Sequence, residues 1–326
     1  MTESQSNIMT SEQAAKNADL IIAEVEKAVI GKHGTLVKML AAFLCSGGHV
    51  LLEDVPGLAK TLIASSFARA LGLDFKRIQF TPDLLPGDIT GGFIFDTRQN
   101  QFVLRKGPVF SNILLADEIN RASPKTQSAL LEAMQERQVS LEGETLQLPE
   151  PFIVIATQNP IEYEGTFALP EAQLDRFLIR LSVGYPSLEE EKEILERRSD
   201  RKQDTFDLNP VIKPQDLLQM RQLVENIYIS PDIQDYIVQL VANTRHHRQI
   251  DLGVSPRGSL ALLKLSRAAA AIQGRNYVIP DDVKSYVECS LCHRIILNPN
   301  LWGSKNAAHD LIGQIIQAIP VPVMPE

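Results

Sequence analysis

The spacing of apolar residues predicts a layered α/β region in the first half of the chain. Five short apolar runs alternate with helical or polar segments, and they are His49–Glu53, Phe75–Phe80, Asn112–Ala116, Phe152–Ala156 and Phe177–Val183. Runs this short and this apolar are typical of strands that are buried on both faces of a parallel sheet. The alternation of strand and helix predicts an α/β, doubly wound layer.

Helical spacing dominates the rest of the chain. One periodic stretch, Asn17–Leu44, precedes the first strand and ends at Ser46-Gly47-Gly48. After Tyr185-Pro186-Ser187 the pattern predicts a series of helices with capping residues or prolines at their starts, namely Leu188–Arg198, Pro214–Ile227, Pro231–Arg245, Ser255–Gln273, Pro280–Arg294 and Asn306–Ala318. We therefore expect two domains, an α/β domain at residues 1–184 and a smaller helical domain at residues 185–326.

Two segments interrupt the alternation of strands and helices. Residues 88–110 contain two alternating apolar runs around a polar turn, and residues 139–148 repeat this pattern with Glu142-Gly143-Glu144 at the turn. Both patterns predict β-hairpins. Neither hairpin is needed to close the predicted sheet, so both are expected to be insertions.

Composition narrows the class of protein. The chain has 326 residues, of which 44% are hydrophobic and 22% charged, with a net charge of −8. This balance is typical of globular proteins, and the negative charge makes a nucleic-acid partner unlikely by sequence. No apolar run approaches the roughly 20 residues of a membrane span, and the first twelve residues lack a signal pattern. We expect a cytoplasmic protein.

The three cysteines do not indicate a disulfide framework. Cys289-Ser-Leu-Cys292-His293 matches the short pattern for covalent haem attachment, but the stretch also has helical spacing and the chain shows no export signal. Buried thiols on a helix are the favoured interpretation. His246-His247 lies near a predicted helix end, where cationic residues favour the helix dipole, so it is not taken as a metal site.

The clearest chemical signal is residues 53–61, EDVPGLAKT, between a predicted strand and a predicted helix. A phosphate-binding loop requires this context. In such a loop the N–H groups at the helix N-terminus would hold the phosphates. Lys60 would contact the β- and γ-phosphates, and Thr61 would bind Mg2+. The common pattern has glycine where this chain has Asp54 and Ala59. Alanine is a mild change, whereas Asp54 brings a carboxylate to the start of the loop. The alternative is an ordinary strand–turn–helix connection.

Polar residues follow two later strands. Asp117 and Glu118 end the third apolar run, and Asn159 follows the fourth. The carboxyl ends of parallel strands lie on the same rim as the loop. There Asp117 can hold Mg2+ through water, and Glu118 can accept the proton of an attacking water. Asn159 can orient that water, although an asparagine before proline is usually a turn residue.

Together these motifs resemble the MoxR family of AAA+ ATPases from about residue 20 to about residue 300. No single motif is specific, but their order and spacing are. The motifs are Val29-Ile30-Gly31, Pro56–Thr61, Asp117–Ala122, Gln127–Glu136, Ala156–Pro160, Glu164-Gly165-Thr166, Leu169–Phe177 and Ser255-Pro256-Arg257.

The resemblance implies an AAA+ P-loop NTPase core, a parallel five-stranded sheet between helices, with a smaller all-helical lid. It implies ATP and Mg2+ as ligands and a homo-oligomeric ring, a hexamer. The catalytic set is then Glu118, Asn159 as sensor 1, Arg176 as an arginine finger that reaches a neighbouring subunit, and Arg257 as sensor 2. The nucleotide contacts are Ile30 and Gly31 beside the adenine, then Pro56, Gly57, Leu58, Ala59, Lys60, Thr61 and Leu62; the metal residues are Thr61 and Asp117.

Three functions are compatible with this core. The first is an ATP-driven chaperone that remodels or matures a protein client, for which the resemblance implies a partner with a von Willebrand factor A domain and hairpins that face the pore or a partner. The second is a nucleic-acid motor, which the net charge disfavours. The third is a regulatory scaffold that binds nucleotide without turnover, supported only by Asp54. Arg176 could instead pair with Asp175 or Glu171, and Arg257 could be a solvent-exposed residue at a helix start.

Overall fold

The computed structural model describes residues 9–159, 167–301, 304 and 306–322. It contains two compact units. The sheet unit comprises Glu24–Leu36 and Gly47–Pro210, and the helical unit comprises the described residues up to Ala23, Val37–Ser46, and those from Val211 onward. Pro160, the motif Glu164-Gly165-Thr166 and both ends of the chain lie outside the described residues.

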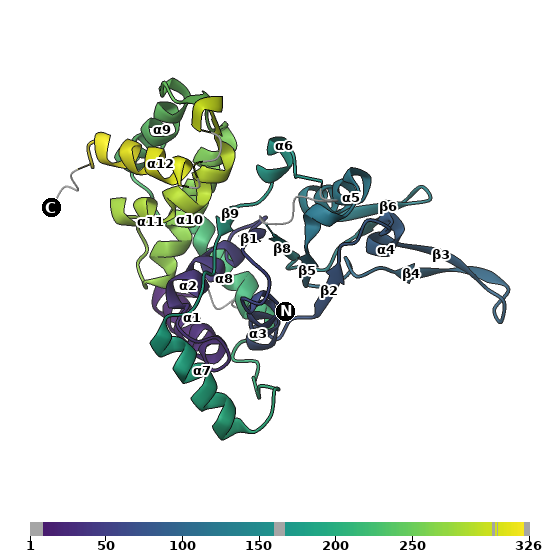
Figure 1. Ribbon diagram of the computed structural model, residues 1–326. Coiled ribbons are helices and arrows are strands. Elements are labelled where there is room, and N and C mark those ends of the chain that lie inside the picture. Colours follow the sequence, from purple (N-terminus) through teal and green to yellow (C-terminus); the bar gives the residue numbers. More distant parts are fainter. Residues whose placement is uncertain (1–8, 160–166, 302–303, 305, 323–326) are drawn as a thin grey trace, which may run out of the picture. The chain divides into compact units, whose positions relative to one another are not determined.

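A five-stranded parallel sheet forms the centre of the sheet unit (Figure 1). Its strands follow the order β2-β5-β8-β1-β9, and they are β1 (Val50–Glu53), β2 (Phe75–Gln79), β5 (Ile113–Asp117), β8 (Ile153–Gln158) and β9 (Ile179–Leu181). The five strands predicted from apolar runs are confirmed, with their ends within about two residues. Because all strands are parallel, β1, β5 and β8 end at the same rim.

Burial on both faces was predicted for all five strands, and this is wrong for β2. The inner strands β5 and β8 are almost completely buried, whereas Lys76 and Arg77 on β2 are exposed. The reason is the strand order, which places β2 at the edge of the sheet. Three of the six residues in the run Phe75–Phe80 are polar, as an edge position permits.

Helices cover both faces of the sheet. On one face, Leu114 and Val154 join a buried cluster with residues of α4 (Pro86–Thr90) and α5 (Pro124–Glu136). Side chains alternate along a strand, so Leu115 and Ile155 point to the opposite face, where they are equally buried. The helix α3 (Lys60–Ala70) contacts β5 and buries Ile63 and Phe67. The expected doubly wound layer is therefore present.

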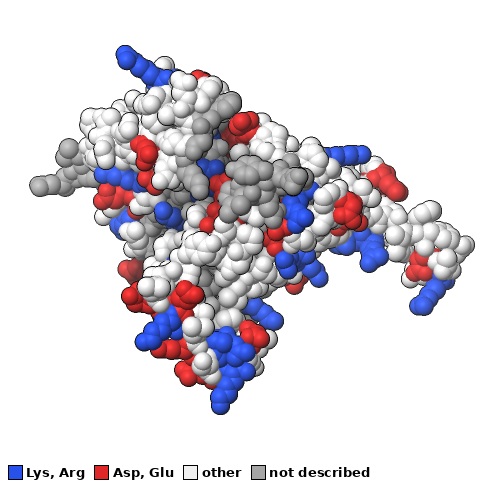
Figure 2. All heavy atoms as spheres, in the orientation of Figure 1, with Lys and Arg blue, Asp and Glu red and all other residues white. Residues whose placement is uncertain are grey.

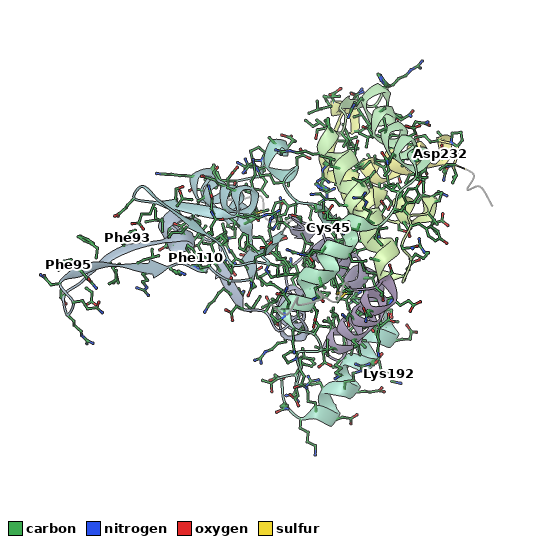
Figure 3. The ribbon with its side chains drawn as sticks, turned by 180° about the vertical axis from the view of Figure 1, so that it is seen from behind. Cys45, Phe93, Phe95, Phe110, Lys192 and Asp232 are labelled. Carbon is green, nitrogen blue, oxygen red and sulfur yellow. The ribbon has the colours of Figure 1, made fainter. Side chains whose placement is uncertain are left out.

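Two predicted hairpins are confirmed. The first pairs β3 (Gly91–Asp96) with β4 (Gln101–Lys106), and the second pairs β6 (Gln138–Leu141) with β7 (Glu144–Gln147). In Figure 1, β3 and β4 extend outward from the rest of the sheet unit. Phe95 on β3, labelled in Figure 3, lies edge-to-face against Phe102 on β4 with ring centroids 5.3 Å apart, and both rings are at least half exposed.

The helical unit contains the predicted C-terminal helices, with ends shifted by only a few residues. They are α8 (Pro214–Asn226), α9 (Pro231–His246), α10 (Pro256–Ile272), α11 (Pro280–Leu291) and α12 (Ala307–Ala318). A short antiparallel pair, β10 (Ile250–Leu252) and β11 (Ile296–Leu297), was not predicted. The cysteines on α11 and its extension are buried, and burial raises the pKa of Cys289 to about 12. The structure thus favours core thiols over haem attachment.

The periodic stretch Asn17–Leu44 predicts one continuous helix, and this prediction is wrong. The chain forms α1 (Ser11–Glu26) and α2 (His33–Phe43), separated by a turn at residues 27–32. Gly31 has a φ of +71°, a left-handed conformation that a helix interior does not allow. Helical periodicity continues across the break because Val29 is buried like the residues before it.

The compact units divide at residues 210 and 211, not at the domain boundary expected at residue 185. The helix α7 (Leu188–Arg201) belongs to the sheet unit. Its Arg197 donates to the carbonyl of Glu26 at 3.1 Å, and the backbone N–H of Asn209 donates to Glu24 at 2.8 Å. These long-range contacts hold residues 187–210 to the sheet unit, although this segment is polar and was expected to belong to the helical domain. Among the described helices, none has the length and apolar content needed to cross a membrane.

Candidate functional site

The loop between β1 and α3 has the backbone of an anion-binding loop. Gly57 has a φ of +88°, and Ala59, the residue before α3, has a left-handed φ of +53°. The side chain of Ala59 cannot cap the helix, so the first N–H groups of α3 stay available to a ligand. Left-handed alanine costs roughly 1 kcal/mol or more, which marks the position where glycine is common in such loops.

Lys60 is the first residue of α3 and is half-buried beside the loop. Its ammonium Nζ donates to the backbone carbonyl of Asp54 at 2.7 Å. Desolvation lowers the pKa of Lys60, and the negative charges of Asp54, Asp117 and Glu118 oppose that shift. The lysine is thus held close to the acids at the rim, where it can contact an anionic ligand.

Thr157 on β8 connects the two acids at the end of β5, Asp117 and Glu118. Its buried hydroxyl donates to Oδ1 of Asp117 at 2.6 Å and accepts from the backbone N–H of Glu118 at 2.8 Å. Glu118 itself has a left-handed φ of +54°. The neighbouring strand therefore orients the carboxylate of Asp117 and the backbone of Glu118.

Two side chains on β2 also hold these acids, and sequence analysis missed them. Arg77 Nη2 donates to Oδ2 of Asp117 at 2.7 Å, and Gln79 Nε2 donates to Oε2 of Glu118 at 2.6 Å. Arg121 reaches the same Glu118 oxygen at 3.0 Å. The polar character of Arg77 and Gln79 within a strand was visible in the sequence. Only the pairing of β2 with β5, which sets Gln79 opposite Asp117, places these two residues at the rim.

One cavity of about 440 Å3 joins the loop to the acids. The sequence-predicted residues that line it are Pro56, Gly57, Leu58, Ala59, Lys60, Thr61, Leu62, Asp117, Glu118 and Asn159. Asn159 is buried, and Asn120 Nδ2 donates to its backbone carbonyl at 3.5 Å. A helix N-terminus, a lysine, a threonine hydroxyl and a carboxylate fit a phosphate chain with Mg2+, because magnesium takes few protein ligands and shares the phosphate oxygens.

A second cavity of about 400 Å3 adjoins the first and is mainly apolar. Gly57, Leu58, Ala59 and Leu62 line both cavities. Val29, Ile30, Val183 and Pro186 add apolar walls to the second one. Gly31 packs against α7, where a Cβ atom would lie 2.0 Å from the Glu190 carboxyl carbon. The size and apolar lining suit the base of a nucleotide whose phosphates lie in the first cavity.

The two predicted arginines do not line either cavity. Arg176 lies between the short helix α6 (Glu171–Leu174) and β9, three residues before β9 begins. It is therefore at the amino end of the sheet, whereas the loop between β1 and α3 is at the carboxyl end. Among the described residues it forms no salt bridge, and its Nε is buried without a hydrogen-bond partner. Arg257 lies in the helical unit, exposed at the start of α10.

Asp54, the departure from the usual loop pattern, directs its carboxylate toward the residues that follow β9. It accepts hydrogen bonds from the Ser182 hydroxyl at 2.8 Å and from the backbone N–H groups of Val183 and Gly184. The side chain is buried and does not line the cavity that joins the loop to the acids. The carboxylate at the start of the loop thus makes its hydrogen bonds with the segment that follows β9.

This strand order, with a glycine-containing loop between β1 and α3 and two acids at the end of β5, is that of an AAA+ ATPase. Residues 49–179 match the family described as "ATPase family associated with various cellular activities (AAA)", and residues 242–315 match an AAA lid domain. The chain belongs to the MoxR family of these ATPases.

Relatives of the chain match over nearly its whole length. Uncharacterized protein YeaC of Bacillus subtilis is 48% identical, over 93% of this chain and 94% of that protein. Chaperone MoxR1 of Mycobacterium tuberculosis is 44% identical, over 92% of this chain and 81% of its own length. The crystal structure of a Cytophaga hutchinsonii protein superposes with a TM-score of 0.89. The match has 39% sequence identity and covers 96% of this chain and 97% of that one.

Proposed function

We propose that the chain hydrolyses ATP with Mg2+ in the two joined cavities of the sheet unit. The observation that carries this proposal is that Lys60, Thr61, Asp117, Glu118 and Asn159 line one cavity although they come from three separate segments. The apolar cavity beside them is large enough for the adenine. Membership of an ATPase family supports the same activity.

Each residue has a chemical role in this proposal. Lys60 binds the β- and γ-phosphates together with the N–H groups of α3, and Asn159 orients the attacking water. Glu118 accepts the proton of that water as general base. Thr61 and Asp117 would hold Mg2+, and the bound ion would supply positive charge that offsets the negative charge of the phosphates. Since Arg77 and Thr157 already engage the Asp117 carboxylate, a water-mediated contact suits Asp117.

We also propose that hydrolysis takes place between subunits of a homo-oligomeric ring of six. Arg176 is at the amino end of the sheet and does not line the cavity that holds Lys60 and Glu118 in its own chain. A neighbouring chain can receive it. An arginine supplied in trans can raise the rate roughly a thousandfold or more, so the isolated chain should turn over ATP very slowly. Arg257 is proposed to act from the helical unit as sensor 2.

The work that turnover drives is proposed to be remodelling or maturation of a protein client in the cytoplasm. The relative named Chaperone MoxR1 supports the chaperone role. The first hairpin offers exposed Phe95 and Phe102 for contact with a client or a partner. A partner with a von Willebrand factor A domain remains part of this proposal. Figure 2 shows acidic and basic side chains intermixed on the face drawn, which favours a protein over a nucleic acid as the target.

Turnover per chain, measured against protein concentration with Mg2+ present, tests this function. We expect the specific rate to rise as chains assemble and to disappear when the metal is chelated. A specific rate that stays constant down to the lowest concentration would contradict the shared site. Binding of ATP without turnover in assembled rings would instead support the regulatory scaffold.

Replacing Thr157 by valine is expected to impair both stability and turnover. Valine has the same shape but leaves the N–H of Glu118 without its partner, at a cost of about 1–3 kcal/mol. The Asp117 carboxylate and the backbone of Glu118 also lose the hydroxyl that positions them, so turnover should fall about tenfold. Thermal unfolding and phosphate release measure the two effects.

Thr244→Val is the matched control for this change. The Thr244 hydroxyl is also buried, accepts from the N–H of Val254 at 3.0 Å, and lies in the helical unit. We expect it to lower stability by a similar amount and to leave turnover at low temperature unchanged. Equal loss of turnover in both variants would mean that Thr157 has only a structural role.

A further inference from the structure

Asp54 joins two parts of the site that are far apart in sequence. Its backbone carbonyl accepts a hydrogen bond from Nζ of Lys60, which lines the cavity that joins the loop to the acids. We call this the phosphate cavity. Its carboxylate accepts from Ser182, Val183 and Gly184, which follow β9. One residue thus links the phosphate loop to a segment more than a hundred residues later in the chain.

The segment that Asp54 holds is a wall of the second, mainly apolar cavity, which we call the base cavity. Val183 and Gly184 line that cavity together with the loop residue Leu58 and with Leu62 of α3. Gly184 has a φ of +68°, so the chain turns sharply here before Pro186. The carboxylate of Asp54 satisfies the buried N–H of Val183 at this turn.

Glycine at position 54 would leave this wall without its anchor. The Val183 N–H and the Ser182 hydroxyl would lose an anionic acceptor, and hydrogen bonds to charged groups are among the stronger ones in proteins. The contact of Lys60 would remain, because it uses the backbone of residue 54. Replacing the aspartate therefore removes hydrogen bonds at the base end of the site, and it leaves the hydrogen bond of Lys60 to the backbone intact.

We infer that Asp54 is a positioning residue that shapes the base cavity and so sets the affinity for the adenosine part of the nucleotide. The inference rests on the proposed function, because it takes the two cavities as one nucleotide site. It assigns the unusual loop residue to recognition of the base and not to weakened phosphate binding.

Two ligands separate these roles in titration calorimetry on the full chain, namely ADP and inorganic tripolyphosphate, which has no base. For Asp54→Gly we expect the Kd of ADP to rise about tenfold while the Kd of tripolyphosphate stays within about twofold. The isosteric Asp54→Asn keeps one acceptor oxygen and should show a smaller rise for ADP. Turnover at saturating ATP should stay within about twofold in both variants, so that KM changes and kcat does not.

Asp96→Asn is the control, because Asp96 also accepts a backbone N–H, that of Arg98, but in the first hairpin. It should leave both ligands unaffected. Equal changes for both ligands, or tighter ADP binding in Asp54→Gly, would overturn the inference, as would unchanged affinities in folded variants. Failure of the unsubstituted chain to bind either ligand would overturn the proposed function itself.

Discussion

Replacing Glu118 by glutamine is expected to lower turnover at saturating ATP by at least about a hundredfold while ATP binding is retained. An amide cannot accept the proton of the attacking water, and general base catalysis contributes roughly two to four orders of magnitude. Glutamine has the size of glutamate and can still accept from Gln79, so the site should keep its shape. Phosphate release measures turnover, and calorimetry with ATP measures binding.

Glu132→Gln is a suitable control because Glu132 is an exposed acid on α5, near Glu118 in sequence but outside the cavity. It should behave as the unsubstituted chain does. If Glu118→Gln kept turnover within about threefold of the unsubstituted chain, another group would have to be the base. If it lost ATP binding as well, its effect would be structural.

Replacing Arg176 by alanine is expected to reduce turnover about a thousandfold without preventing assembly. An arginine at the γ-phosphate stabilises the charge of the transition state, and its loss in related phosphoryl-transfer sites costs three orders of magnitude or more. Arg176 contributes no salt bridge within the described part of its own chain, so its removal should cost little stability. Phosphate release and sizing chromatography with ATP measure the two expectations.

Arg248→Ala provides the comparison, since Arg248 is an exposed arginine in the helical unit. It should leave turnover unchanged. Normal turnover in Arg176→Ala would remove this residue from the site, and loss of the assembled form would reassign it to subunit packing.

Much of the fold could be predicted because apolar periodicity is a local signal. The five strands and the C-terminal helices differ from their predicted bounds by a few residues. The break at Gly31 was missed because periodicity runs through it, and the unit boundary was missed because α7 is polar in composition but is held to the sheet unit by Arg197 and Glu24.

The gathering of Lys60, Asp117 and Asn159 in one cavity was also predictable, because residues at the carboxyl ends of parallel strands share one rim. The contributions of Arg77 and Gln79 were not, since they depend on which strand lies beside β5. The direction of the Asp54 carboxylate depends on β9, which sequence cannot place next to β1.

Mixed assemblies of two inactive variants test the central claim, a site shared between subunits. Glu118→Gln chains keep Arg176, and Arg176→Ala chains keep Glu118. When the two are co-expressed in equal amounts, about half of the sites keep the base and about half of those have a neighbour with the arginine. The account predicts about a quarter of the turnover of the unsubstituted protein. Mixed assemblies as inactive as either variant alone would contradict it.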